Sequence, residues 1–74
     1  MQQTLLLRVS HGYVRNIAPW AFVPEDDRSK VTLVDADAVQ FLNESGWTTL
    51  NVVPVDGGYF DKEIWLVREV EGGS

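Results

Sequence analysis

Residues 47–70 read WTTLNVVPVDGGYFDKEIWLVREV, and they hold the clearest β pattern of the chain. Two runs rich in β-branched and aromatic residues, 47–55 and 59–70, flank the triplet DGG at 56–58. An Asp-Gly turn between two such runs is a strong hairpin signal. The pattern therefore predicts a β-hairpin with a three-residue loop.

The side-chain faces of this hairpin predict its register, with Val55 opposite Tyr59. One face is then largely apolar, and its expected pairs are Leu50 with Ile64, Thr48 with Leu66, and Val52 with the stem of Lys62. A one-residue slip would mix core and solvent positions on both faces, so we favour the first register. Because Pro54 cannot donate a ladder hydrogen bond, we expect it at a sheet edge or a bulge.

The opposite face of the predicted hairpin carries two indoles. Trp47 is expected beside Val67, and Trp65 beside Thr49. Acidic side chains surround both pairs: Asp61, Glu63, Glu69 and Glu71. This face is therefore apolar at its centre and negatively charged at its rim.

Two interpretations of this face stay open. In the first, the N-terminal strand and the loop at 13–22 cover it as a second layer, with Trp20 and Phe22 filling the space. In the second, one or both indoles are exposed as a binding hot spot, because aromatic anchors inside a polar rim are typical of interfaces. The second interpretation, extended to the acidic loop after Phe22, gives our candidate partner-binding residues: Trp47, Trp65, Val67, Glu63, Glu69, Trp20, Phe22, Glu25, Asp26 and Asp27.

A helix is predicted just before the hairpin, from Asp35 to Ser45. Asp35 suits the N-cap, although a start at Thr32 with a capping box remains an alternative. Gly46 is expected to end the helix in the left-handed conformation. The helix has one buried stripe at i, i+3 and i+4, formed by Ala38, Phe41 and Leu42.

In the first half of the chain, the sequence pattern predicts shorter secondary-structure elements. A strand is expected over 4–9, because Leu5, Leu7 and Val9 alternate with other residues, followed by a turn at 10–12. A short strand near 13–17 comes next in this prediction.

Two prolines, Pro19 and Pro24, then indicate an ordered loop. Residues 25–29 are expected to be a solvated loop and residues 30–33 a short strand.

These elements predict an α+β fold in a single compact domain, residues 1–71, with residues 72–74 as a flexible tail. The expected sheet is antiparallel with three to four strands and has one helix packed on it. The N-terminal strand could join either edge of the hairpin, so the sheet order stays open.

Composition limits the function classes. The 74 residues include no cysteine, so neither disulfides nor a thiolate metal site hold the fold together. No apolar run is long enough to cross a bilayer, and the N-terminus lacks the pattern of a secretory signal, so we expect a cytoplasmic protein.

The net charge is −5, and it is unevenly distributed: residues 1–20 have two arginines and no acid (+2), whereas residues 21–74 have four bases and eleven acids (−7). This charge opposes direct nucleic-acid binding and favours a basic protein surface as partner.

Residues that could carry catalysis or bind a metal are few. His11, the only histidine, follows Ser10 directly, a spacing that is unfavourable for a triad. The pair Asp35 and Asp37 and the run at 25–27 lack the remaining ligands of a calcium or zinc site. Asp61 and Glu63 would need a concave pocket for acid and base chemistry. We therefore predict no enzymatic activity, no cofactor and no metal.

In its brevity, acidity, lack of cysteine and single domain, the chain resembles the small regulators that bacteriophages use to bind and redirect host machines, among them proteins that bind bacterial RNA polymerase. The resemblance implies a stoichiometric inhibitor or modulator without catalytic residues. CRISPR effectors, nucleases and restriction enzymes are further targets that fit the same composition.

Two other functions stay open. One is a single-stranded nucleic-acid binder that stacks bases on Tyr13 and Trp20, with help from Arg8 or Arg15. The other is a structural accessory subunit or a homodimer formed by β-pairing at the hairpin edge, although we favour a monomer.

Overall fold

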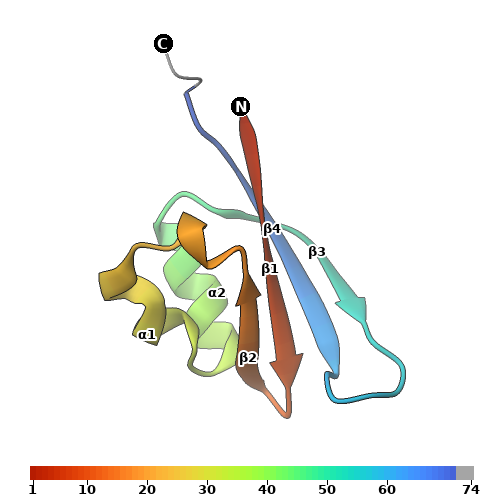
Figure 1. The fold of residues 1–74 in the computed structure, drawn as a ribbon. Coiled ribbons are helices and arrows are strands. Elements are labelled where there is room, and N and C mark those ends of the chain that lie inside the picture. Colours follow the sequence, from red (N-terminus) through yellow and green to blue (C-terminus); the bar gives the residue numbers. More distant parts are fainter. Residues whose placement is uncertain (72–74) are drawn as a thin grey trace.

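One antiparallel sheet of four strands, with its helices on one side, forms the α+β fold that the sequence predicts (Figure 1). The computed structural model describes residues 1–71, so the tail predicted at 72–74 lies outside the described residues. The strands are β1 (Gln2–Ser10), β2 (Tyr13–Ala18), β3 (Thr48–Pro54) and β4 (Lys62–Glu69). The helices are the 3-10 turns η1 (Trp20–Phe22) and η2 (Glu25–Asp27), followed by α1 (Arg28–Val31) and α2 (Asp35–Glu44).

The strand order β2-β1-β4-β3 places the N-terminal strand in the middle of the sheet. β1 pairs with β4 over eight residues, from Gln2 opposite Glu69 to Val9 opposite Lys62. The first interpretation of the indole face is therefore wrong in one respect, because β1 extends the hairpin sheet instead of forming a second layer over it.

The turn between β1 and β2 is the predicted one. His11 and Gly12 both have positive φ angles, 54° and 80°, as a two-residue turn that follows the twist of its strands requires. The backbone N–H of His11 donates to Asp61 Oδ2 at 2.6 Å, which ties this turn to the loop that precedes β4. The two hairpins of the sheet are therefore joined at this end.

The segment after β2 is helical, so the loop predicted at 25–29 and the strand predicted at 30–33 are wrong. Three acids follow Pro24 at the start of η2, where negative charge is favourable to the helix dipole. Val31 at the end of α1 is fully buried in the core. The residues after α1 reach the outer edge of β2, where the carbonyl of Leu33 accepts a hydrogen bond from the N–H of Val14 at 3.0 Å.

Helix α2 begins and ends close to the predicted residues. Its N-cap is Val34, and Asp35 is the first helical residue, with Oδ1 accepting from the N–H of Ala36 at 2.7 Å. At the C-terminus Gly46 has a φ of 99°, and the N–H of Trp47 donates to the carbonyl of Leu42 at 2.9 Å. This pattern is a Schellman motif, as Gly46 predicts.

The second hairpin keeps the predicted faces near its loop but not the predicted register. Val52 lies opposite Ile64 and Val53 opposite Glu63, a shift of two residues from the expected pairs. Because the shift is even, Ile64 still faces the core. A bulge at Leu50 then exchanges the faces of Thr48 and Thr49, so that Thr49 lies opposite Leu66.

A loop longer than three residues explains this shift. Val55 donates its N–H to the carbonyl of Asp61 at 2.9 Å, and Asp61 donates its own to the carbonyl of Val9 at 2.7 Å. The guanidinium of Arg8 lies 5.8 Å from the centre of the Phe60 ring. Contacts with β1 therefore fix the end of the loop. The sequence of the hairpin alone gives no information on these contacts.

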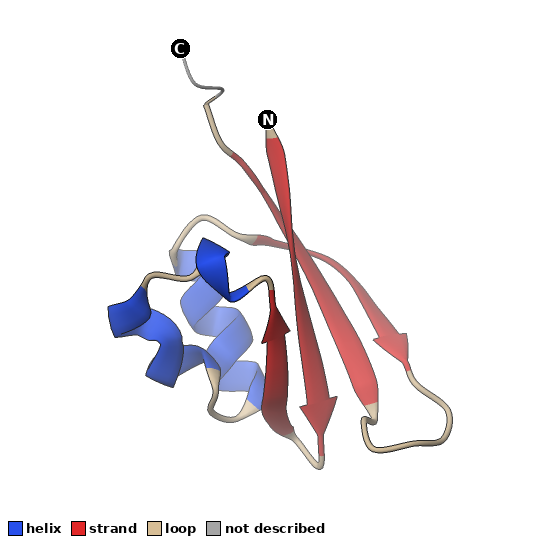
Figure 2. Ribbon diagram, in the orientation of Figure 1, coloured by secondary structure: helices blue, strands red, loops and turns tan. Residues whose placement is uncertain are grey.

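The core lies between the sheet and the helices, which are on one side of the sheet (Figure 2). It is almost entirely aliphatic, with one tryptophan, and its buried members are Leu5, Leu7, Val9, Val14, Ile17, Val23, Val31, Ala38, Leu42, Trp47, Ile64 and Leu66. Half-buried Trp20, Phe22, Val39 and Phe41 pack against it. The predicted stripe of α2 is thus confirmed, with Ala38 and Leu42 buried and Phe41 at its margin.

The Gly46 position provides a test of the helix end. We expect Gly46→Ala to lower the free energy of unfolding by about 1 kcal/mol, because an alanine at this φ is strained although there is space for its Cβ. Gly46→Asn should cost less, since asparagine adopts this conformation more readily. Urea unfolding followed by tryptophan emission measures both, and equal stabilities of all three proteins would contradict this account.

Candidate binding surface

One face of the sheet is covered by the helices, and the other is not covered by any helix of the described chain (Figure 2). Strand alternation determines which residues lie on each face. On β4, Ile64 and Leu66 are buried under the helices, whereas Trp65 between them points to the uncovered side and is half-buried. We call this side the open face.

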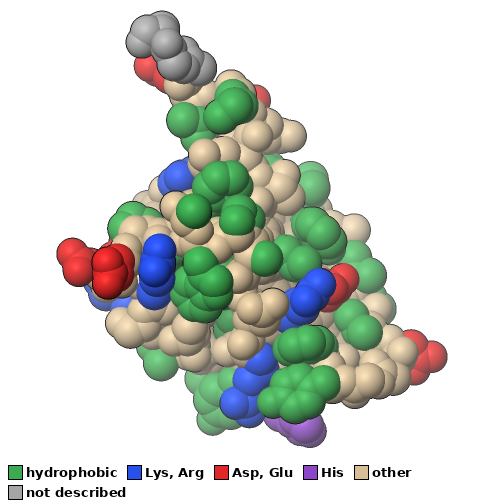
Figure 3. Space-filling model, in the orientation of Figure 1, with side chains coloured by type: hydrophobic (Ala, Val, Ile, Leu, Met, Phe, Trp, Pro, Cys, Tyr) green, Lys and Arg blue, Asp and Glu red, His purple; other side chains and the backbone are tan. Residues whose placement is uncertain are grey.

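The open face has Trp65 near its centre. Register places Leu6 on β1 and Asn51 on β3 on either side of Trp65, and Ala18 on β2 beyond Leu6. The next row towards the N-terminus of β1 contains Thr4 and Val67, followed by Thr48. The space-filling view shows that hydrophobic side chains reach the surface in several places and are interspersed with charged ones (Figure 3).

A charged row crosses the open face beside Trp65. Arg8 and Glu63 lie opposite each other, and Arg8 Nε donates to Glu63 Oε2 at 3.3 Å. The Arg8 guanidinium also lies over the ring of Phe60. Glu63 is thus at the rim, as predicted, but its charge is compensated by Arg8, which was not predicted at this place.

Trp47 does not lie on the open face, which corrects its predicted place beside Val67 on the same face as Trp65. Only 3% of its surface is exposed, and the Arg68 guanidinium lies 4.5 Å from its ring centre. The Schellman motif directs this side chain inward, because the residue after the left-handed glycine packs against the last turn of the helix. Phe22 lies against it on the helix side, with ring centres 6.3 Å apart.

The other predicted partner-binding residues fall into two separate groups. Val67 and Glu69 lie on β4 with Trp65, and Glu69 Oε2 is 3.9 Å from the N-terminal ammonium group. Trp20 and Phe22 pack on the core from the helix layer.

The acidic run at 25–27 continues the helix layer as η2. Glu25 and Asp26 are exposed there, and Asp27 Oδ1 lies 3.9 Å from Lys30 Nζ. The structure therefore does not bring this acidic run together with Trp65.

The polar residues that were considered for catalysis are engaged in structural contacts. Ser10 Oγ lies 3.0 Å from His11 Nδ1, but Ser10 is only 2% exposed. Asp61 accepts from the backbone of His11 and not from its ring. Within residues 1–71, no three His, Cys, Asp or Glu side chains form a group that could hold a metal ion.

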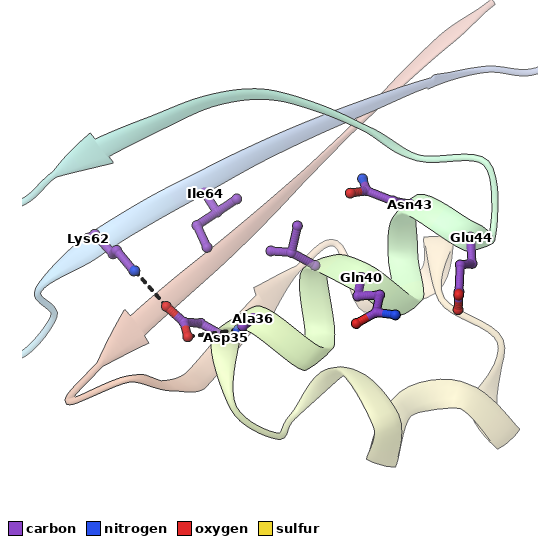
Figure 4. A pocket seen from close by; sticks show the side chains of 8 residues that line it. Asp35, Ala36, Gln40, Asn43, Glu44, Lys62 and Ile64 are labelled. Atoms are coloured by element: carbon purple, nitrogen blue, oxygen red, sulfur yellow. Dashed lines mark hydrogen bonds and ion pairs between the residues drawn. The ribbon is translucent and has the colours of Figure 1, made fainter.

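A groove lies on the helix side, between α2 and β4 (Figure 4). It has a volume of about 600 Å³, and its apolar lining is formed by Ala36, Val39 and Ile64. Asp35 and Lys62 form an ion pair at one end. The hydrogen bond from Lys62, helped by one from the N–H of Ala36, lowers the pKa of Asp35 below its ordinary value.

Leu6, Arg8 and Phe60 were not predicted as members of the open face, and Lys62 was not predicted as the partner of Asp35. The alternation of β1 already puts Leu6 and Arg8 opposite to the core residues. Their neighbours depend on the strand order, which local patterns do not contain.

Compared with protein-family models, with curated proteins and with solved structures, the chain matches none. No helix in the described part of the chain has the length and hydrophobicity needed to span a membrane.

The ion pair of Asp35 gives a pH-dependent prediction. Since the pKa of Asp35 is lowered in the folded state, its contribution to stability is present above the ordinary Asp pKa and is lost as the pH falls through the lowered value. We expect Asp35→Asn to cost about 0.5 kcal/mol at neutral pH, because Lys62 is partly exposed, and to cost less in acid.

Urea unfolding from neutral to acid pH measures this difference. Asp37→Asn is the control, because Asp37 is an exposed acid in the same helical turn. A difference between wild type and Asp35→Asn that stays constant with pH would contradict the assignment.

Proposed function

We propose that this chain is a non-enzymatic protein-binding module, and that its open face docks on a basic surface of a larger partner. One observation carries the proposal: Trp65 lies half-buried near the centre of an uncovered sheet face, between Leu6 and Asn51. Binding hot spots usually consist of a large aromatic side chain with apolar neighbours and a polar rim.

In this proposal the affinity for the partner and the rate of encounter with it have different sources. Trp65, Leu6 and Val67 are only half-buried, so a partner would remove further apolar surface from water. The net charge of −5 speeds the encounter with a basic surface. Because Arg8 already compensates Glu63, the attraction comes from the charge of the whole chain more than from this rim.

The general type of partner follows from the resemblance to small phage regulators. A stoichiometric modulator needs a rigid face and no catalytic group. We propose that the chain inhibits or modulates a host machine in this way. Bacterial RNA polymerase is the first target to test.

Binding of single-stranded nucleic acid is less well supported. The aromatic residues invoked for it lie apart, with Tyr13 on β2 and Trp20 in the helix layer. Arg8 is paired with Glu63, and Arg15 lies against the ring of Tyr13, at 5.6 Å from its centre. The basic groups that would contact phosphates are thus few and partly engaged.

Two substitutions on the open face test the proposal. With purified bacterial RNA polymerase immobilised, we expect Trp65→Ala to weaken binding at least about tenfold, since it removes the aromatic anchor. Thr4→Arg should weaken it as well, because Thr4 is exposed opposite Val67 and an arginine there repels a basic partner. Biosensor titration measures both affinities.

The matched control is Asp26→Asn on the helix layer, which should change the affinity by less than about twofold. Circular dichroism verifies that each variant is folded. Polymerase binding that is equal for wild type, Trp65→Ala and Thr4→Arg would contradict the open face as the docking surface. Absence of polymerase binding would reject this target. Tryptophan emission that changes when single-stranded oligonucleotides are added at low salt would favour the nucleic-acid alternative.

A further inference from the structure

The two edges of the sheet differ in how far they are covered. At the β2 edge, Val14 donates to the carbonyl of Leu33 at 3.0 Å, and Asp35 donates to the carbonyl of Gly12 at 2.9 Å. At the other edge, β3 pairs with β4 on one side, and no strand or bridge of residues 1–71 pairs with its outer side. The outer side of β3 therefore presents backbone groups for a further strand.

Backbone alternation shows which groups these are. Val55 donates inward to Asp61, and N–H groups in an antiparallel pair alternate in direction along the strand. The N–H and C=O groups of Val52 consequently point outward, and so does the C=O group of Pro54. Because Pro54 has no N–H, an added strand finds its hydrogen bonds over the part of β3 that precedes this proline.

The side chains of β3 are unusual for an exposed edge. Residues 45–55 (SGWTTLNVVPV) include no charged residue, although the chain as a whole has a net charge of −5. Leu50 and Val52 expose 64% and 49% of their surface. Exposed edges in monomers normally have charges that prevent pairing, and β3 has only its bulge and Pro54. A second negatively charged copy therefore meets no like charge on this strand.

We propose that β3 pairs in antiparallel fashion with β3 of a second copy of this chain, so that two four-stranded sheets join into one. Such a contact is isologous, which requires a strand that is complementary to itself. The midpoint of Thr48–Pro54 is Asn51. Full overlap places Asn51 beside Asn51 of the second copy and Leu50 beside Val52 of the second copy, so that the exposed aliphatic side chains cover each other.

This dimer uses a different part of the sheet from the proposed partner, although Asn51 lies at the border of both contacts. The contact is made by the edge of the sheet, whereas the proposed docking surface is its open face around Trp65. Pairing of the two edges would align the two open faces in one continuous surface with two indoles. Loss of the dimer through a change at Val52 should leave a single open face intact, because Val52 lies opposite Ile64 on the other side of the sheet.

Molecular mass measured over a concentration series tests the pairing. We expect the mass of the full chain, measured by light scattering, to rise from that of a monomer towards twice that value as the protein concentration increases from about 1 μM to about 1 mM. Val52→Lys should keep the chain monomeric over the series, because it introduces a charge at the proposed contact. Leu33→Lys, at an apolar residue that is 52% exposed outside β3, should behave like wild type. A wild type that stays monomeric, or a dimer that persists in Val52→Lys, would overturn the proposal.

Because the sequence has no cysteine, a single introduced cysteine allows a second test. In this test the substitution is expected to trap the dimer, so the result does not depend on a substitution that destabilises it. In the proposed register the two Cβ atoms at position 51 are about 4.5–5.5 Å apart, close enough for a disulfide after a small adjustment. We expect Asn51→Cys to form a covalent dimer on mild oxidation, seen by non-reducing electrophoresis. Thr32→Cys, exposed in the helix layer, is the control and should stay monomeric. Cross-linking at position 32 but not at position 51 would also overturn the proposal.

Discussion

The central pairing of β1 with β4 is the interaction on which the rest of this small domain depends. β1 is hydrogen-bonded on both sides, so it joins the N-terminal hairpin to the C-terminal hairpin in one sheet. Its buried residues form the sheet side of the core: Leu5, Leu7 and Val9. A single two-stranded hairpin is only marginally stable in water, and the shared central strand removes this limit.

The same arrangement makes the two faces of the sheet different. The short helices are sufficient to cover one face, and no helix within residues 1–71 lies over the other. Trp47 and Trp65 show the consequence. Trp47 follows the end of α2 and is drawn into the core, whereas Trp65 lies on β4 between two buried residues and stays at the uncovered side. A surface that the fold leaves uncovered is where we place the proposed protein contact.

Several features were predictable from the sequence because they depend on neighbouring residues. The alternation in β1, the stripe of α2 and the left-handed Gly46 all follow local rules, and the structure confirms them. The register of β3 was not predictable in the same way. It depends on Phe60 and Asp61, which contact β1 and thereby lengthen the loop. The helical residues 25–31 were missed since a polar run fits a loop and a helix start equally well.

The sequence by itself determined the α+β class, the hairpins, the helix before the second hairpin and the negative charge, because composition and residue period act over a few positions. Only the tertiary structure decided that β1 lies beside β4, that Arg8 neutralises Glu63, that one tryptophan is buried and the other is not, and that β3 is the uncovered edge. The physical reason is that pairing between distant strands depends on how all apolar faces are buried together, and no local pattern contains that information.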